Sequence, residues 1–372
     1  MEDRAGEIRS TMRPQYEVTV QPDEFTTAAS TAFDYAFSGT SKFEGWGMPC
    51  IPQQFKLGLI IGPSGSGKSL LLSQFGKEEI PEWNPNKAVV SHFTSPQEAI
   101  DRLMSVGFNT IPAWCRPYHV LSNGEKFRAD LARKIRTNAV LDEFTSVVDR
   151  NVAKAASVSL RRYVDSHDVN NVVLASCHYD ILEWLRPDWY FDTVDGILHD
   201  GRLLRRPSVE IKLYPCKRSL WSMFAKHHYL TEKLSGSCRS YVAVADFGSG
   251  ETIVGFSSTI SFPHGYIKNA YREHRTVVLP DFQGLGFGPR ISDAVAQLHL
   301  DEGKRYFSRT AHPRFGAYRD RSPLWKSASN NKKVSRKTAY TESSKKQTWS
   351  IDSTRECFSH EYIGKEFNAG KP

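Results

Sequence analysis

Residues 62–69 of the chain read Gly62-Pro63-Ser64-Gly65-Ser66-Gly67-Lys68-Ser69, and they match the pattern G-x-x-x-x-G-K-[ST] at every position. An apolar run at 57–61 precedes them, and residues 70–75 are typical of a helix start. A buried strand, a glycine loop and a helix N-terminus form the setting in which backbone N–H groups surround phosphate oxygens. The stretch therefore predicts a nucleoside triphosphate site, in which Lys68 reaches the β- and γ-phosphates and Ser69 binds Mg²⁺.

Two later apolar stretches end in residues that suit hydrolysis. Residues 139–141 run into Asp142 and Glu143, and residues 172–177 run into His178. An aspartate at a strand end can hold the Mg²⁺ shell, and the adjacent glutamate can polarise the attacking water. Each pattern alone is weak, since an Asp-Glu pair is usually a solvated turn and a single histidine is usually structural. Their order behind the phosphate loop favours a hydrolytic site.

Over about residues 40–200 the chain resembles an ABC-type ATPase. The resemblance implies that 62–69 is the Walker A loop and that 140–143 is Walker B, with Glu143 as the catalytic base and Asp142 as a Mg²⁺ ligand. It further implies a D-loop at 146–149 and a switch histidine at His178. ATP and Mg²⁺ are the cofactors that follow from this resemblance.

The remaining motifs of that family have candidates as well. Residues 121–125 match the signature loop, and Gln97 is the candidate for the Q-loop glutamine. The nucleotide-binding candidates in the signature loop are Ser122, Asn123 and Gly124. Either Phe43 or Trp46 could stack on the adenine, and either could be ordinary core.

The signature loop departs from the family pattern at two positions. Asn123 stands where the family usually has glycine, and Glu125 stands where it usually has glutamine. Asparagine tolerates left-handed backbone, so the loop shape can survive, whereas a carboxylate beside a phosphate predicts slow hydrolysis. The stretch from Lys68 to Leu121 is also short for a full helical subdomain, which argues against a transporter.

Composition and length limit the classes of protein to which this chain could belong. A chain of 372 residues with a net charge of +8 is long enough for two domains. No apolar run approaches the ~20 residues that span a bilayer, so no membrane association is expected. The charged N-terminus lacks a secretory pattern and the six cysteines form no C-x-x-C pair, which predicts a cytoplasmic protein without a disulfide framework or a zinc site.

A domain boundary is predicted near residues 195–207. Residues 196–204 have the pattern of a closing hairpin with an Asp-Gly turn. We therefore expect an N-terminal extension at 1–40, an ATPase domain at 41–204 and a second domain at 205–372.

The second half holds another strand, glycine loop and helix. An apolar strand at 277–279 leads into the loop, and apolar residues recur at helical spacing over 289–298. Upstream, 240–245 and 251–258 are predicted as an antiparallel strand pair, and 220–230 as an early amphipathic helix. The loop lacks a Lys-Ser pair, so it is not a second Walker A, but its N–H groups could hold a pyrophosphate.

This unit resembles motif A of the GNAT acyltransferases, Q/R-x-x-G-x-G/A, with Gln283, Gly286 and Gly288 at the defining positions. The resemblance implies an α+β domain that binds acetyl-CoA or another acyl-CoA. The implied acyl-CoA-binding residues are Leu279, Gln283, Gly284, Leu285, Gly286, Phe287 and Gly288. Tyr318 is the candidate general acid, and His228 or His264 could face the acceptor. The alternative is a glycine-rich turn without a ligand.

The whole combination resembles a prokaryotic and phage family of ABC-type ATPases fused to a predicted acetyltransferase. Its second half is similar to the Mom DNA-modification protein of phage Mu, which makes DNA a candidate acceptor and a phage-infected or prokaryotic cell the expected setting. The segment 304–346 carries thirteen lysines and arginines against two acidic residues, Asp320 and Glu342, with interleaved aromatics. A solvated surface with a loop at 332–347 explains this charge equally well. A last strand is expected at 357–364.

The sequence thus predicts an α/β protein in which a P-loop ABC-type ATPase precedes an α+β GNAT acyltransferase. Because the chain has one Walker A and one signature loop, an ATP-dependent homodimer is expected. Two alternatives stay open. One is an acetyltransferase for a protein or a small amine, with the ATPase as a switch. The other is a nucleic-acid-binding ATPase with an inactive GNAT module.

Overall fold

The computed structural model describes residues 14–228, 233–248, 250–339 and 348–364, without side chains for 334–355. The chain divides into two compact units. The first comprises Met1–Gly107 with Arg116–Pro207, and the second comprises Phe108–Cys115 with Ser208–Pro372. The short segment Phe108–Cys115 therefore belongs to the second unit, although its neighbours in sequence on both sides belong to the first.

The first unit is built on a five-stranded sheet of order β4-β5-β3-β6-β7. Strands β4, β5, β3 and β6 run parallel, and β7 closes the sheet antiparallel to β6. The strands are β3 (Leu57–Ile61), β4 (Val140–Leu141), β5 (Val172–Ser176), β6 (Trp189–Asp192) and β7 (Ile197–Asp200). All residues of β3 and β5 are buried, as expected for central parallel strands covered on both faces. The strands predicted at 57–61 and 172–177 are confirmed.

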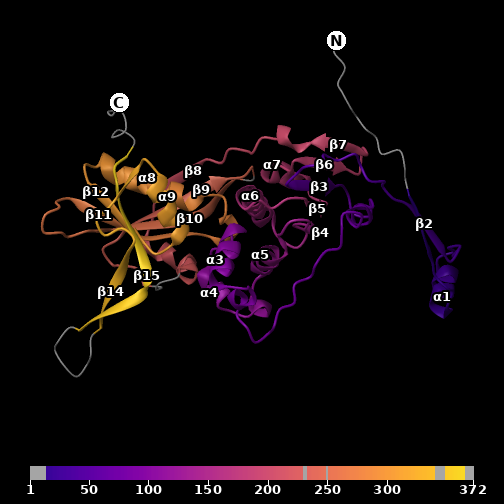
Figure 1. Cartoon of the computed structure of the whole chain (residues 1–372), viewed down its shortest axis with the longest axis horizontal. Coiled ribbons are helices and arrows are strands. Elements are labelled where there is room, and N and C mark those ends of the chain that lie inside the picture. Colours follow the sequence, from indigo (N-terminus) through magenta and orange to yellow (C-terminus); the bar gives the residue numbers. More distant parts are fainter. Residues whose placement is uncertain (1–13, 229–232, 249, 340–347, 365–372) are drawn as a thin grey trace, which may run out of the picture. The chain divides into compact units, whose positions relative to one another are not determined.

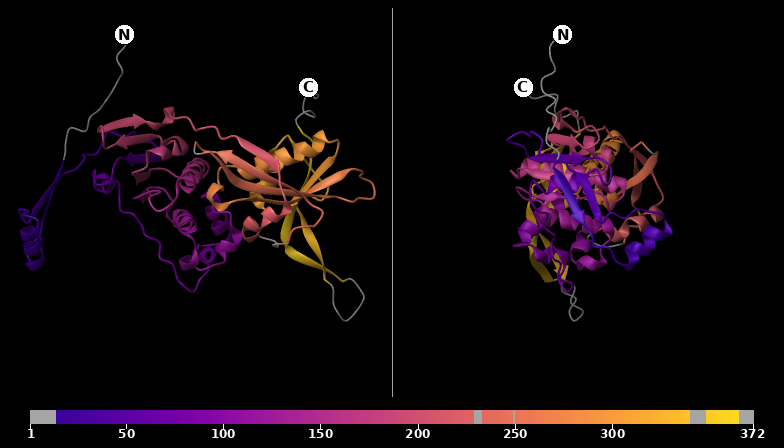
Figure 2. Two further views of the ribbon diagram at one scale, coloured as in Figure 1. Left: turned by 180° about the vertical axis from the view of Figure 1, so that it is seen from behind. Right: turned by 90° about the vertical axis from the view of Figure 1, so that its right-hand side faces the viewer.

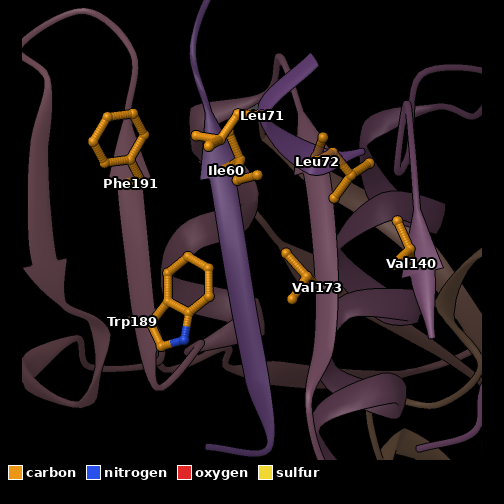
Figure 3. Close-up of a cluster of buried hydrophobic side chains, with 8 residues drawn as sticks. Ile60, Leu71, Leu72, Val140, Val173, Trp189 and Phe191 are labelled. Carbon is orange, nitrogen blue, oxygen red and sulfur yellow. The ribbon is translucent and has the colours of Figure 1, made fainter. Parts of the chain in front are cut away.

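One hydrophobic cluster holds the helix that follows the phosphate loop against this sheet. Figure 3 shows side chains from β6, β3, β5 and β4 meeting Leu71 and Leu72 of helix α2 (Lys68–Leu72). Strand β6 contributes Trp189 and Phe191 to this cluster, and each side chain is about 1% exposed. The phosphate loop between β3 and α2 is therefore fixed at both ends by buried packing.

Helices complete the first unit (Figure 1). The longer ones are α3 (Pro96–Ser105), α5 (Asn123–Lys134) and α6 (Arg150–Ser166). The short ones are η1 (Val89–His92), η2 (Tyr118–Val120), η3 (Tyr179–Ile181), α7 (Leu182–Leu185) and η4 (Gly201–Leu203). A separate two-stranded sheet pairs β1 (Gln15–Thr19) with β2 (Thr40–Glu44), and α1 (Glu24–Ala32) lies between them in sequence.

The closing hairpin forms, but not at the predicted turn. Its strands are β6 and β7, so the reversal falls at 193–196. Asp200 and Gly201 instead begin η4, where the Asp200 side chain accepts a hydrogen bond from the backbone N–H of Arg202. The prediction of an Asp-Gly turn inside 196–204 was wrong because Asp200 acts as a cap.

The second unit is built on an eight-stranded sheet with the path β13-β15-β12-β11-β10-β9-β8, and β14 pairs with β15. All pairs are antiparallel except β11 with β12. The strands are β8 (Ile211–Pro215), β9 (Arg239–Asp246), β10 (Glu251–Ser261), β11 (Ala270–Val278), β12 (Arg305–Thr310), β13 (Trp325–Ser327), β14 (Lys333–Ala339) and β15 (Thr348–Tyr362). The helices are α4 (Ile111–Trp114), η5 (Arg218–Met223), η6 (Ala225–His227), η7 (Pro280–Phe282), α8 (Phe287–Asp301) and α9 (Pro313–Arg321). Figures 1 and 2 show β14 and β15 as an arm that extends from the sheet.

Several predictions for this unit are confirmed and two are wrong. The strand pair β9 and β10 and the helix α8 form where the sequence predicts them, and β15 covers most of the last strand predicted at 357–364 but begins earlier, at Thr348. The early helix predicted at 220–230 is, up to residue 228, the two 3₁₀ segments η5 and η6, because Trp221 and Phe224 turn into the core against Phe256, and 229–230 lie outside the described residues. The loop predicted at 332–347 contains β14, and 340–347 lies outside the described residues. In the described part of the chain, no helix has the length and apolar character needed to cross a bilayer.

Candidate functional site

The phosphate loop of the first unit has a backbone that glycine permits. Gly62, Gly65 and Gly67 have φ values of 150°, 78° and 87°. At Gly67, which caps α2, a Cβ atom would also lie 2.8 Å from the ring of Phe43. The loop thus combines left-handed backbone with close approach of a neighbouring ring, and both exclude larger residues.

A cavity of about 320 Å³ opens beside this loop. Its lining residues are Phe43, Ser64, Gly65, Gly67, Lys68, Ser69, Leu70, Asp142, Glu143, Ser146 and Cys177. The Lys68 ammonium donates a hydrogen bond to the Pro63 carbonyl at 2.6 Å and so lies folded over the loop. Ser66 faces away from the cavity and shares a hydrogen bond of 2.6 Å with Thr193.

Asp142 and Glu143 follow the short strand β4 directly and reach the same cavity. The backbone N–H of Glu143 donates to Asp142 Oδ1 at 2.8 Å, and Glu143 itself has a φ of 48°. Glu78, which the sequence did not single out, accepts from the backbone N–H of Asp142 at 3.2 Å and pairs with Lys134 at 2.7 Å. Glu78 thereby ties the turn after β4 to the end of α5.

The oxygen atoms predicted to bind Mg²⁺ fit that ion. Ser69 and Asp142 line one cavity, although they come from different elements. Hydroxyl and carboxylate oxygens are the ligands that Mg²⁺ prefers. The side chains present are therefore of the right kind for a nucleotide-bound Mg²⁺.

His178 lies next to the cavity lining without being part of it. Its neighbour Cys177 lines the cavity, while His178 Nδ1 lies 3.3 Å from Thr145 Oγ1. Burial, and then the nearby Arg150, lower the pKa of His178 below its ordinary value. The imidazole is thus neutral near pH 7, and its switch role stays a prediction.

The other predicted nucleotide residues lie elsewhere in the first unit. Among the described residues, the cavity lining does not include Gln97, Ser122, Asn123 or Gly124. The Gln97 amide lies on the first turn of α3 and donates to Asp101 at 3.3 Å. Ser122 caps α5, and Glu125 completes a capping box by accepting from the Ser122 N–H at 3.0 Å. The signature loop is thus the start of α5.

The two candidates for adenine stacking are separated by the structure. Phe43 lines the cavity. Trp46 instead donates from Nε1 to the Ser66 carbonyl at 2.9 Å and packs edge-on against Phe191. Trp46 therefore supports the back of the loop, and Phe43 presents the only ring among the lining residues.

The glycine loop of the second unit links β11 to α8 through η7. Gly284 and Gly286 have φ values of 95° and 82°, and Gly286 caps the fifteen-residue helix α8. Leu285 and Phe287 are buried, which directs the backbone of the loop outward. A Cβ at Gly288 would meet Phe315 of α9 at 3.0 Å. Leu279, the last residue before η7, is bonded through its N–H to Val254 at 3.0 Å.

Gln283 has a defined set of partners inside the second unit. Its amide donates to the Val278 carbonyl at 3.0 Å, and its carbonyl accepts from the Asn109 N–H at 2.9 Å. Asn109 belongs to the segment Phe108–Cys115. The side chain thus braces the start of the loop, and its role in binding acyl-CoA stays a prediction.

Tyr318, the predicted general acid, lies on α9 with its hydroxyl donating to Asp293 of α8. Burial and this neighbouring carboxylate raise the pKa of Tyr318 to about 12. Trp325 Nε1 donates to the other Asp293 oxygen at 2.8 Å. The phenol would have to leave Asp293 before it could protonate a thiolate, and its role stays a prediction.

Comparisons with known proteins give fold-level likenesses only. No protein-family model and no curated protein matches the chain. One similar solved structure is a dimeric ATP-binding cassette in a post-hydrolysis state with ADP and Pi (14% identity, 44% of this chain, 93% of that chain, TM-score 0.35). Another is a Bacillus subtilis acetyltransferase in complex with CoA (9%, 42% and 98%, TM-score 0.29), and a third is the ribosomal-protein-S18-alanine N-acetyltransferase from Escherichia coli (10%, 44% and 100%, TM-score 0.28). The chain is a mixed α/β protein whose similar structures include cassette ATPases and acetyltransferases.

Proposed function

We propose that the chain is an ABC-type ATPase coupled to an acyl-CoA-dependent N-acyltransferase of GNAT type. One observation carries the ATPase part: the cavity of the first unit is lined by Lys68, Ser69, Asp142 and Glu143 together. A cation, a hydroxyl and two carboxylates around a glycine loop are the groups that a Mg²⁺-triphosphate and an attacking water require.

Each group has a role in this site. Lys68 and the loop N–H groups would neutralise the β- and γ-phosphates, and Ser69 and Asp142 would hold a Mg²⁺ that supplies further positive charge. Glu143 would accept a proton from the attacking water. His178 would reach the γ-phosphate as a neutral imidazole.

Binding of ATP tests this part directly. Lys68→Ala should weaken Mg²⁺-ATP binding at least about tenfold, because it removes a charge-assisted contact to phosphate. Lys87→Ala is the matched control, since Lys87 is exposed and does not line the cavity. Calorimetry that finds equal affinity in Lys68→Ala and the parent would refute the site.

The proposed assembly is an ATP-dependent homodimer. Ser122, Asn123 and Gly124 lie at the start of α5 and are absent from the lining described for the cavity, so a second copy would have to supply a signature loop. Glu143→Gln should show the dimer most clearly, because it holds ATP without turnover. Light scattering with Mg²⁺-ATP should then give twice the mass seen without nucleotide. An unchanged monomer mass in that variant would contradict the assembly.

The acyltransferase part rests on the loop between β11 and α8. The cap Gly286 and the buried Leu285 and Phe287 leave backbone N–H groups at the N-terminus of a long helix, where a pyrophosphate is stabilised. We propose that acyl-CoA binds there. A chain that binds ATP but not acyl-CoA would instead be a nucleic-acid-binding ATPase with an inactive second module.

We further propose DNA as the acceptor of the acyl group. The basic segment supports this proposal less than its charge suggests, because several of its cations form ion pairs within the protein. Four cations of the basic segment are already paired: Lys304 with Glu302, Arg305 with Glu361, Arg319 with Glu273 and Lys332 with Asp320. Arg309, Arg321 and Lys326 are exposed, and we propose them as the cations that would contact DNA. Retention on DNA that falls steeply with salt supports a DNA acceptor; transfer to a small amine or a protein without DNA retention favours the other acceptors.

A further inference from the structure

Strands β11 and β12 separate shortly after they meet. Their parallel pairing covers Ala270 with Arg305, Tyr271 with Tyr306 and Arg272 with Phe307. Beyond this point β11 continues to Val278 and β12 to Thr310. Because the pairing covers only the first three residues of each strand, the fork opens at their carboxyl ends, and the glycine loop follows the carboxyl end of β11. Crevices at the carboxyl ends of such strands are where α/β sheets bind ligands.

Buried polar side chains fill the base of this fork. Glu273 and Ser308 are the next residues on the two strands, and Ser308 Oγ donates to Glu273 Oε2 at 2.6 Å. Thr276 donates to the other oxygen, Glu273 Oε1, at 2.6 Å. Both oxygens of the carboxylate are therefore engaged where the strands part.

Arg319 of α9 connects the fork to the helix of the glycine loop. Its Nη2 donates to Glu273 Oε2 at 2.7 Å and to Ser292 Oγ of α8 at 2.8 Å, and its Nη1 donates to Ser308. The rings of Phe315 and Trp325 each lie 4.5 Å from the guanidinium carbon, and the side chain is 0% exposed. One planar cation thus links β11, β12 and α8 from a fixed orientation.

We infer that Arg319 and Glu273 are positioning residues for acyl-CoA. The pair sets the width of the fork between β11 and β12 and the placement of α8 beside it. This inference rests on the acyl-CoA site proposed above, and it adds residues that lie outside the glycine motif. It also assigns Glu273 a role other than general base, because Arg319, Ser308 and Thr276 already occupy three of its acceptor positions and the adjacent guanidinium stabilises the ionised carboxylate.

The test measures CoA binding by calorimetry on the intact chain, at a temperature where circular dichroism shows each variant folded. Arg319→Lys keeps the charge, but its single nitrogen cannot replace the two guanidinium nitrogens that donate to three partners. Glu273→Gln keeps the volume but places an amide N–H₂ group against donors. Asp320→Asn is the matched control, because Asp320 also binds a buried partner of this unit, His360, at 2.8 Å, but lies outside the fork network.

We expect both fork variants to bind CoA at least about tenfold more weakly than the parent, since small displacements of positioning groups are costly. Asp320→Asn should stay within about twofold, and Mg²⁺-ATP affinity should be unchanged in all three. Parental CoA affinity in folded Arg319→Lys and Glu273→Gln overturns the inference and leaves the acyl-CoA site standing. A parent that binds no CoA refutes the proposed function itself.

Two further outcomes are decisive. If Glu273→Gln keeps parental CoA affinity but loses acetyl-CoA hydrolysis, Glu273 is a base and the inference is wrong. If Arg319→Lys does not fold, the double variant Glu273→Leu/Arg319→Met removes both charges at similar volume. Weakened CoA binding in that folded variant supports the inference, and parental binding overturns it.

Discussion

The ring of Phe43 lies directly against Gly67 in the phosphate loop, so close that a Cβ at Gly67 would be 2.8 Å from it. The same ring lines the cavity beside this loop. We propose that Phe43 stacks on the adenine, because Trp46 is instead bonded to the back of the loop.

Phe43→Leu should therefore weaken ATP binding about tenfold, because an aliphatic side chain keeps the packing against Gly67 but loses base stacking. Binding of inorganic triphosphate, which has no base, should stay within about twofold. Trp46→Phe is the control, since loss of its hydrogen bond to Ser66 should affect both ligands equally. Calorimetry that finds equal losses for both ligands in Phe43→Leu would rule out stacking.

Glu143→Gln should lower ATP turnover by about 10²–10⁴-fold, the range expected for loss of a general base. Glutamine has the same size and tolerates the backbone at this position comparably, so ATP affinity should stay within about twofold. Phosphate release under saturating ATP measures the effect. Turnover at the parental rate would show that Glu143 is not the base.

Glu125→Gln should have the opposite effect. Glutamine preserves the capping box with Ser122, but it removes a negative charge from the loop proposed to contact the γ-phosphate of a second copy. We expect turnover to rise severalfold, most clearly at low ionic strength, where charges are least screened. A rate below that of the parent would mean that the carboxylate itself assists the reaction.

Lowering the pH should reduce the free energy of unfolding of the second unit before Glu302 and Asp320 are protonated. Burial lowers the pKa of His228, His274, His299 and His312 to about 4. Below pH 6.5 the unfolded chain then binds more protons than the folded one, so stability falls as the pH drops from about 6.5 to about 4. Glu302 and Asp320, with pKa values of about 2, add to this loss only below their unfolded values near 4.

His312→Asn isolates one of these histidines. His312 caps α9 by accepting from the Phe315 N–H, and asparagine is an equally good cap that does not titrate. The variant should lose less stability than the parent between pH 7 and pH 5, by on the order of 1 kcal/mol per pH unit. Urea unfolding at both pH values measures the difference, and identical pH dependence would contradict a buried neutral His312.

Most residues that line the cavity of the first unit could be predicted, because they lie in contiguous motifs. The strand 57–61, the loop and the acidic pair after β4 are local patterns with fixed spacing. The sequence left Phe43 and Trp46 as equal candidates for the adenine and did not single out Glu78, since a ring or a carboxylate distant in sequence carries no local signal of the loop that it approaches. Arg319 is the clearest case: within a basic segment it suggested a nucleic-acid contact, yet it is buried against Glu273.

The place of the segment Phe108–Cys115 in the second unit could not be predicted from the sequence either. Its residues lie within the stretch assigned to the ATPase, but it joins the second unit, where the Asn109 N–H donates to Gln283. Neither periodicity nor turn residues signal such a crossing, because the pattern of a short helix is the same in both units. The 3₁₀ segments η5 and η6 were missed for a similar reason, as aromatic spacing near Trp221 fits an amphipathic helix equally well.

We propose that this one chain has two separate ligand sites, and binding of CoA to paired variants of Gly286 tests this most directly. Gly286→Ala and Gly286→Glu share the strain of a left-handed backbone, with a φ of 82°, but only the glutamate places a long negative side chain where the pyrophosphate would lie. Calorimetry on the intact chain should show CoA binding in the parent, weakened but measurable binding in Gly286→Ala and none in Gly286→Glu, with Mg²⁺-ATP affinity unchanged in all three. A parent that binds Mg²⁺-ATP but not CoA, or a Gly286→Glu variant that binds CoA as tightly as Gly286→Ala, would contradict the account.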